Sequence, residues 1–303
     1  MNSVEWMVRY RRFLKRRNYS VHTVKNYLNI LSQFSLWLKR PIEEVTSKEI
    51  GAYTDHLLGK RQKPKTINCH LGTLRAFYDY LHDEEGLALI HPVKKAYRLR
   101  LPKPLPKHLK DEQVTLLFKE IKDARDRAMF MLMLRCGLRV EEVARLSTDA
   151  IDYPRRHLFV FNGKGSKDRV VYLSEDTSAA VAEYLKKRGA LKVKKMFLVQ
   201  KGPMKGKPIS VRGIQKRMEH YARKSAIEVS CHQLRHTMAT QLLNADADLV
   251  TIQDLLGHSR IATTQRYCRV SNLKVQRDYY KAIEVVLQRT LPRRENELDL
   301  NKR

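Results

Sequence analysis

The chain has 303 residues, which is long enough for two domains with hydrophobic cores, and its apolar fraction of 43% is ordinary for a globular protein. Its 60 Lys and Arg residues outnumber 32 Asp and Glu residues, and the formal charge of +28 predicts a polyanionic partner, with nucleic acid as the first candidate. The N-terminus lacks a signal core, and no stretch approaches the roughly 18 apolar residues of a membrane span, so we expect a cytoplasmic protein with no membrane partner.

Residues 1–100 are predicted to form four helices, because apolar residues recur there at helical spacing in four stretches. Thr46 and Glu49 fit a capping box at the start of the third helix. The loop before the fourth helix is basic, and a DNA backbone is its expected contact through Lys60, Arg61, Lys63 and Lys65. A generic four-helix bundle with a solvated basic face is the alternative.

Residues 101–106 read L-P-K-P-L-P, a proline-dense segment that cannot continue a helix and is therefore predicted to be a linker. The second domain is predicted over residues 107–303. It begins with a helix from Asp111 and a buried helix over 126–134 that stops at Gly137. Arg139 follows at the start of the next helix, next to the core.

Two β-branched and aromatic runs, at residues 158–161 and 170–173, flank a loop that contains two glycines and predict a β-hairpin. Lys164 lies between these glycines, and the loop does not match a P-loop. Lys167 and Arg169 are nearby candidates for phosphate contacts, although any of the three cations could be simply solvated.

A helix is expected from Thr177 to Arg188, a short strand at Met196 to Val199, and another helix over 210–226. The last of these carries a dense series of cations. We predict that its basic face contacts DNA through Arg212, Lys216 and Arg217, with a solvated face as the alternative.

Three short helices are predicted between Cys231 and Val270. In the first, Leu234 and Met238 share an apolar face, whereas His232 and Arg235 share the other face. The second helix ends at a glycine in a C-cap position and presents His258.

The third short helix brings Tyr267 nine residues after His258. A tyrosine nucleophile with Arg and His donors is suited to phosphoryl transfer through a covalent intermediate. A further helix, from about Leu273 to Leu291, carries a regular apolar stripe.

The spaced pattern H-x-x-R, L-G-H and Tyr resembles the C-terminal signature of the tyrosine recombinase (phage integrase) family, and L-L-G-H-S-R-I-A-T-T-Q-R-Y is similar to its Xer-type members. The family motif G-L-R-x-x-E is met by Arg139 and Glu142, and Lys164 matches the lysine of G-K-G-x-K-x-R. One departure is Cys231, which stands where proline often precedes the histidine; it removes no reacting group.

The resemblance implies a mainly α fold with a small antiparallel β-sheet, in which a SAM-like four-helix core-binding domain precedes a mixed α/β catalytic domain. It implies site-specific DNA recombination through a 3′-phosphotyrosyl intermediate, without ATP, metal or cofactor. The implied catalytic set is Arg139, Lys164, His232, Arg235, His258 and Tyr267, supported by Glu142.

The implied partners are double-stranded DNA and either further copies of the chain, as a tetramer on two DNA sites, or a paralogous recombinase. The helix from about Leu273 to Leu291 would be exchanged between protomers. Two other functions remain open: strand passage like that of a type IB topoisomerase, and a DNA-binding regulator without catalysis.

Overall fold

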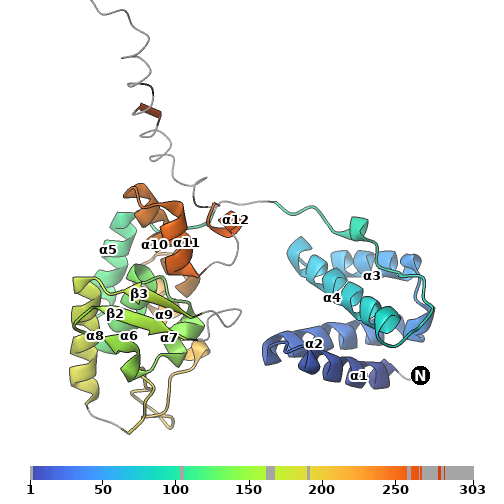
Figure 1. The fold of residues 1–303 in the computed structure, drawn as a ribbon, viewed down its shortest axis with the longest axis horizontal. Coiled ribbons are helices and arrows are strands. Elements are labelled where there is room, and N and C mark those ends of the chain that lie inside the picture. Colours follow the sequence, from blue (N-terminus) through green and yellow to red (C-terminus); the bar gives the residue numbers. More distant parts are fainter. Residues whose placement is uncertain are drawn as a thin grey trace, which may run out of the picture. The chain divides into compact units, whose positions relative to one another are not determined.

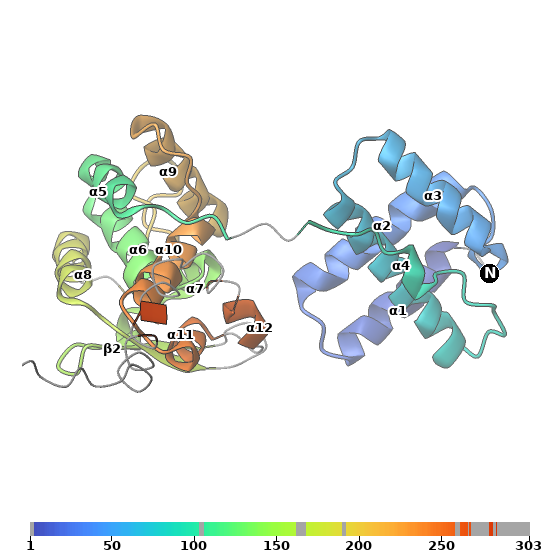
Figure 2. The ribbon, with the colours of Figure 1, turned by 90° about the horizontal axis from the view of Figure 1, so that it is seen from above.

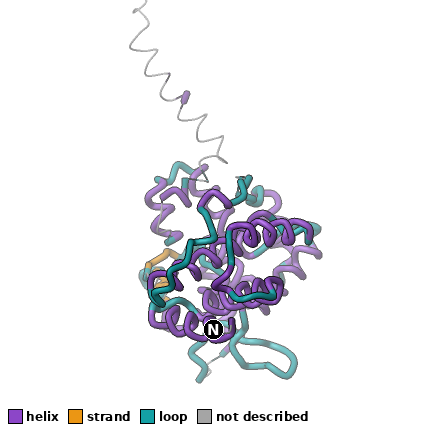
Figure 3. Tube along the Cα trace, turned by 90° about the vertical axis from the view of Figure 1, so that its right-hand side faces the viewer, coloured by secondary structure: helices purple, strands orange, loops and turns teal. Residues whose placement is uncertain are grey.

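The computed structural model of the chain describes residues 3–102, 106–161, 168–189, 192–257, 261–265, 267, 279–280 and 283. It divides into two compact units, Met1–Lys103 and Pro104–Arg303 (Figure 1). Helices dominate both, as the tube in Figure 3 shows. Within these residues, none of the helices combines the length and the apolar character needed to cross a membrane. The predicted fold class, mainly helical with a small antiparallel sheet, is confirmed.

The first unit is a bundle of the four predicted helices. Thr46 caps the third of them: its backbone N–H donates to Glu49 Oε2 at 2.8 Å, and its side chain accepts from the Lys48 N–H at 3.2 Å. The apolar stripes meet in an aromatic core that includes Tyr10, Phe34 and Phe77. The helices are α1 (Ser3–Arg16), α2 (Val21–Leu38), α3 (Ser47–Gly59) and α4 (Pro64–Asp83), with short 3-10 turns at Ile42–Glu44 and Lys95–Tyr97.

The second unit is built around one buried helix. Residues 128–134 of α6 (Ala124–Arg135) are all buried, as their unbroken apolar run predicts. Helices α8 and α10 pack against α6, and α11 lies against α10 (Figure 2). The remaining elements of the unit are α5 (Asp111–Glu120), α7 (Val140–Arg145), a 3-10 turn at Thr148–Ala150, α8 (Glu175–Arg188), α9 (Val211–Lys224), α10 (Cys231–Asn244), α11 (Leu249–Leu256) and α12 (Ile261–Thr264).

A three-stranded antiparallel sheet in the order β1-β2-β3 lies beside these helices. Strands β2 (His157–Val160) and β3 (Arg169–Tyr172) form the predicted hairpin, and Leu158 pairs with Val171 on its buried face. The two-residue strand β1 (Ile151–Asp152) completes the sheet. It was not predicted, because two residues carry no alternation that a sequence pattern could detect.

The strand predicted at Met196 to Val199 is wrong. This segment makes one isolated bridge, between Leu198 and Pro208, instead of a ladder. Two of its carbonyl groups bind side chains, since Arg125 donates to the Leu198 carbonyl at 3.0 Å and Tyr184 to the Met196 carbonyl at 3.1 Å. The Phe197 and Val199 carbonyls accept from the backbone N–H groups of Ile209 and Gly206. The segment is therefore apolar and buried without being a strand. The helix predicted at about Leu273 to Leu291 lies outside the described residues apart from Tyr279, Tyr280 and Ile283.

Candidate active site

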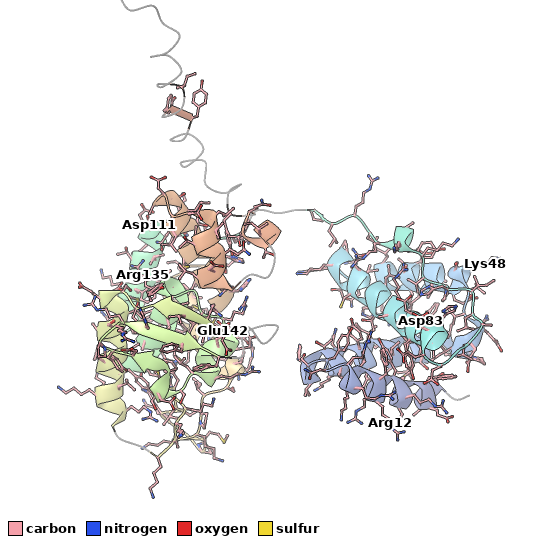
Figure 4. The ribbon with its side chains drawn as sticks, in the orientation of Figure 1. Arg12, Lys48, Asp83, Asp111, Arg135 and Glu142 are labelled. Carbon is pink, nitrogen blue, oxygen red and sulfur yellow. The ribbon has the colours of Figure 1, made fainter. Side chains whose placement is uncertain are left out.

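The turn between α6 and α7 presents Arg139. The preceding Gly137 has a φ of +64°, a conformation that an L-residue rarely adopts, and it ends the buried helix. Arg139 is the N-cap of α7: its backbone N–H donates to Glu142 Oε2 at 2.7 Å and its guanidinium donates to Glu142 Oε1 at 2.9 Å. Glu142 is the residue predicted to support Arg139, and these two bonds join the pair. Glu142 is labelled in Figure 4. A third bond, of 3.4 Å, joins the Arg139 guanidinium to the Gly257 carbonyl.

Arg169, at the start of β3, faces the same carboxylate. Its guanidinium donates to both oxygens of Glu142, each at 2.8 Å, and its Nε donates to the Leu255 carbonyl at 2.9 Å. Its side chain is only 8% exposed. Arg169 was predicted as a DNA contact on a loop, but the structure places it in a buried fork that ties the sheet to α7 and to the end of α11. Its guanidinium fits a carboxylate at this site because the two groups match in a bidentate way.

These bonds set the charge state of Glu142. Burial acts to raise the pKa of this carboxyl, but the hydrogen bonds and charge of Arg169, together with Arg139, lower it to about 2. Glu142 is therefore ionised at neutral pH although its side chain is 7% exposed. The carboxylate fixes two guanidinium groups at once.

Arg235 is the most deeply placed cation of the site. We predicted it on the polar face of α10, but it is 1% exposed. Its guanidinium donates to the Gly137 and Leu256 carbonyls. These carbonyls lie at the ends of two helices, where the carbonyl groups have no partner within the helix, so a long guanidinium side chain can satisfy them from a buried position. Burial, with the positive charges of Arg139 and Arg169, lowers the pKa of Arg235 to about 9.

Tyr267 lies against α10 and is 2% exposed. It packs with Met238, Ala239 and Leu243 in a small apolar cluster, which leaves its hydroxyl toward a histidine. The Tyr267 Oη is 2.6 Å from His236 Nδ1. This histidine in turn contacts the predicted site residue His232, whose ring centroid is 4.3 Å away.

Sequence reasoning missed His236. The signal was present, because a histidine four residues after His232 shares its helix face, yet the motif H-x-x-R draws attention to Arg235 instead. Two members of the predicted set, Lys164 and His258, lie outside the described residues, as does Lys167. Their neighbours are placed: Gly257, before His258, ends α11 in a left-handed conformation, and Arg169 begins the strand after the loop of Lys164.

The predicted DNA contacts of the first unit are exposed, since Lys60, Arg61, Lys63 and Lys65 all lie open to solvent before or at the start of α4. On α9, Lys216 is exposed, and Arg212 is exposed while pairing with Glu219 at 2.8 Å. Arg217 differs: its Nε donates to the fully buried Asp126 at 2.5 Å. This bond joins α9 to α6.

In the described part of the chain, no three His, Cys, Asp or Glu side chains are grouped so that they could hold a metal ion. Among the described residues, Arg139 and Arg169 form ion pairs with the Glu142 carboxylate, and Arg235 interacts with its charge. Three positive charges therefore face one negative charge, and this surplus is suited to an anion.

Comparisons with known proteins identify the family of the chain. Residues 107–274 match the model of the Phage integrase family, and residues 6–86 match the model described as Phage integrase, N-terminal SAM-like domain. Tyrosine recombinase XerC of Staphylococcus haemolyticus is 32% identical over 283 residues, which cover 88% of this chain and 92% of the relative. Tyrosine recombinase XerC of Staphylococcus aureus has the same identity and coverage.

Solved structures share the fold. The Tn1549 transposon integrase in complex with transposon right end DNA superposes with a TM-score of 0.76 at 18% identity, covering 93% of this chain and 100% of that one. XerA recombinase superposes with a TM-score of 0.51 at 24% identity, covering 96% of this chain and 100% of that one. From the two family matches and the XerC relatives it follows that the chain belongs to the phage integrase family and is a Xer-like tyrosine recombinase, a site-specific DNA recombinase.

Proposed function

We propose that this recombinase cuts DNA by attack of Tyr267 on the scissile phosphodiester. The Tyr267 Oη bonds to phosphorus while the bond from phosphorus to the 5′ oxygen breaks, which gives a 3′-phosphotyrosyl link and a free 5′-hydroxyl. A 5′-hydroxyl of the partner duplex then attacks the phosphotyrosyl bond and releases the tyrosine. Because each step exchanges one phosphate ester for another, the reaction proceeds without ATP, and guanidinium groups supply the positive charge without metal or cofactor.

The observation that carries the proposal is the buried surplus of positive charge around Arg235. A buried guanidinium is costly unless a counter-charge and hydrogen-bond acceptors surround it. The carbonyl bonds of Arg235 engage two of the five N–H donors that a guanidinium offers. A scissile phosphate would accept from Arg235 and Arg139 and would supply the counter-charge. Donors of this kind stabilise the transition state, and removal of one costs on the order of 10²-fold to 10³-fold in rate.

The other roles follow from position in the motif. His232 and His258 would hydrogen-bond the phosphate and assist proton movement, and Lys164 would protonate the leaving 5′ oxygen. Support for His258 is that Arg139 binds the carbonyl of the preceding Gly257, which brings that turn to the arginine site. Support for Lys164 is that its loop enters β3 at Arg169, which is itself bonded to Glu142.

We further propose the wider arrangement that this chemistry needs. Residues 1–100 would form the core-binding domain, 101–106 the linker and 107–303 the catalytic domain, so that both domains contact the duplex. The exposed cations at the start of α4 and on α9 would bind its phosphates. Exchange between two DNA sites would need four protomers, all of this chain or shared with a paralogue. Because its substrate would be chromosomal DNA, the protein would act in the cytoplasm.

A covalent capture experiment tests the proposal. The purified chain is incubated with sheared, lightly nicked chromosomal DNA of its source organism, washed under denaturing conditions, and the DNA that stays attached is sequenced. A nick close to the scissile bond lets the short fragment diffuse away, so the adduct persists. We expect adducts at one recurring sequence, lost in Tyr267→Phe and retained in the matched control Tyr172→Phe, whose ring is 61% exposed on β3.

Adducts that persist in Tyr267→Phe would exclude Tyr267 as the nucleophile. DNA binding without adducts in the unaltered chain would favour a non-catalytic regulator. Relaxation of a supercoiled plasmid that lacks the recovered sequence would favour topoisomerase-like strand passage over site-specific exchange.

A further inference from the structure

The hydroxyl of Tyr267, the proposed nucleophile, lies next to His236, a histidine that has no role in the proposed cleavage step. His236 Nδ1 is 2.6 Å from the Tyr267 Oη, and the two ring centroids are 5.5 Å apart at an interplanar angle of 56°. The phenol is 2% exposed, whereas His236 is half-buried. The pair therefore forms in an environment largely shielded from water, where a hydrogen bond is stronger than in solution.

Both partners are held in place by other contacts. His236 belongs to the interior of α10, and its carbonyl accepts from Thr240 Oγ1 at 3.1 Å. The Tyr267 backbone N–H donates to the Thr264 carbonyl at 2.9 Å, and its ring packs against the apolar face of α10. The short distance between the phenol and the imidazole therefore joins a residue inside α10 to a ring that packs on the same helix.

His236 also contacts the proposed phosphate site. Its ring makes an edge contact with His232, at 4.3 Å between centroids and 72° between planes. Tyr267, His236 and His232 are therefore contiguous, with the nucleophile at one end and a proposed phosphate donor at the other. A proton leaving the phenol has an imidazole within hydrogen-bond reach, which is the first requirement for a general base.

We propose that His236 is a further catalytic residue, which accepts the phenolic proton of Tyr267 when the phosphodiester is attacked. The inference rests on the proposed function. The O–H bond of Tyr267 breaks, its proton passes to His236 Nδ1, the phenolic oxygen bonds to phosphorus, and the 5′ oxygen leaves with a proton from another donor. In the joining step the attacking 5′-hydroxyl gives its proton to the group that protonated the leaving 5′ oxygen, and the departing phenolic oxygen takes its proton back from His236. Phenols ionise near pH 10 and are weak nucleophiles at neutral pH, so a base at this position accelerates attack.

The test measures single-turnover adduct formation on a nicked duplex that carries the sequence recovered in the capture experiment. His236→Ala removes the base. His236→Asn keeps a polar amide near the Nδ1 position but cannot take up a proton, and His236→Gln places the amide near the Nε2 position instead. His220→Ala is the matched control, because it removes an exposed histidine of the same unit.

We expect the Ala, Asn and Gln variants of His236 to lose about 10²-fold to 10⁴-fold in cleavage rate, the usual range for general acid–base catalysis, with DNA affinity unchanged. The second arm replaces Tyr267 with a ring-fluorinated tyrosine, whose more acidic phenol needs less help from a base. The loss caused by His236→Asn should then shrink at least tenfold. A residue that only positions the ring would cause the same loss with both phenols.

Three results would overturn the proposal: a His236→Asn rate within about threefold of the unaltered chain, an equal defect with tyrosine and fluorinated tyrosine, or a His236→Asn defect confined to DNA affinity. Failure of the proposed function is recognised separately, because then the unaltered chain would form no adduct, or Tyr267→Phe would still form one.

Discussion

The Arg169 guanidinium donates from Nη1 and Nη2 to the two oxygens of the Glu142 carboxylate, at 2.8 Å each, and so joins the β-hairpin to the helix start that holds Arg139. The Glu142 carboxylate thereby positions both Arg139, which would bind the phosphate, and β3, the strand that follows the loop of Lys164. Arg169 contacts the site through Glu142 and has no need to touch DNA itself.

Substitution of Arg169 should therefore separate DNA binding from cleavage. Arg169→Lys keeps the charge but loses the fork, and we expect cleavage to slow by roughly tenfold or more with little change in DNA affinity. Arg169→Met leaves a buried carboxylate short of a partner and should lower the free energy of unfolding by about 3 kcal/mol. The measurements are single-turnover cleavage, a binding titration and urea unfolding.

The matched control is Arg135→Met, because Arg135 pairs with Asp176 at 3.1 Å on the surface and should contribute little. A loss of DNA affinity in Arg169→Lys larger than its loss of cleavage rate would return Arg169 to the role of a DNA contact.

The depressed pKa of Glu142 predicts a dependence of stability on pH. A carboxyl whose pKa falls on folding contributes stability above its unfolded value, and that contribution is lost as the pH falls toward the folded value. Here the folded value is about 2 and the ordinary value is 4.5, so the contribution, on the order of 3 kcal/mol, declines from about pH 4.5 downward. Unfolding by urea between pH 6 and pH 3.5 measures the onset.

In that pH range Glu142→Gln should show a flatter curve than the unaltered chain, because its amide does not titrate. The exposed Glu183, which pairs with Lys187, provides Glu183→Gln as the control, and this variant should keep the steep curve. Equal slopes in Glu142→Gln and the unaltered chain would show that Glu142 is not the titrating group.

The sequence allowed most of this fold to be predicted because its signals are local. The buried run of α6, the capping box of Thr46 and the glycine that ends α11 each depend on neighbours within one or two turns. The segment 196–199 was predicted wrongly because part of its hydrogen bonding goes to Arg125 and Tyr184, which are distant in sequence, and its backbone bonds to residues 206–209 amount to an isolated bridge. A local pattern of apolar residues cannot distinguish such a buried segment from a strand.

For the site too, local signals could be predicted from the sequence and contacts between distant residues could not. Motif spacing predicted where Arg139, Arg235 and Tyr267 occur, but not how they are partnered. Helical periodicity placed Arg235 on a polar face, and it could not show that carbonyls of two other elements meet there and allow a guanidinium to be buried. The pairs of Arg169 with Glu142 and of His236 with Tyr267 likewise join residues from separate elements.

The turn at Gly137 offers a test of how closely the site tolerates distortion. A Cβ there would lie 2.9 Å from Leu256 Cδ2 and 3.2 Å from Met238 Sδ, in a backbone conformation with a φ of +64°. Gly137→Ala should therefore combine backbone strain with displacement of α11, lower the free energy of unfolding by about 2 to 4 kcal/mol, and reduce cleavage. Thermal unfolding and adduct formation measure the two effects.

Gly202→Ala is the matched control, since Gly202 has a φ of +82° but nothing within 4 Å of the added Cβ. It should show the strain alone, about 1 kcal/mol, and keep its activity. If both variants lost the same stability and activity, steric contact with Leu256 and Met238 would not explain the effect.

Two DNA substrates that differ in their leaving group test Lys164 as the acid. Lys164→Ala should slow cleavage strongly on ordinary DNA, because the 5′ oxygen then leaves without a proton. On DNA with a 5′-thiol leaving group the defect should be much smaller, since a thiolate leaves readily without protonation. Lys167→Ala is the control for loss of a positive charge from the same loop, and any defect it causes should be equal on both substrates. Equal Lys164→Ala defects on the oxygen and thiol substrates would mean that Lys164 acts in another way.

The last prediction is that the segment from about Leu273 to Leu291 docks on a neighbouring protomer when the protein assembles on DNA. Its sequence carries a regular apolar stripe, including Ile283 and Leu287, which is unsuited to a solvated tail. It follows the nucleophile closely, so whatever holds this segment also restricts Tyr267. Truncation before Leu273 should leave binding to a single site nearly intact and abolish synapsis and recombination, as measured by gel shift and by exchange between two sites. Docking on the protomer's own catalytic unit is the alternative, and a truncated chain that recombined two sites at the full-length rate would rule out exchange between protomers.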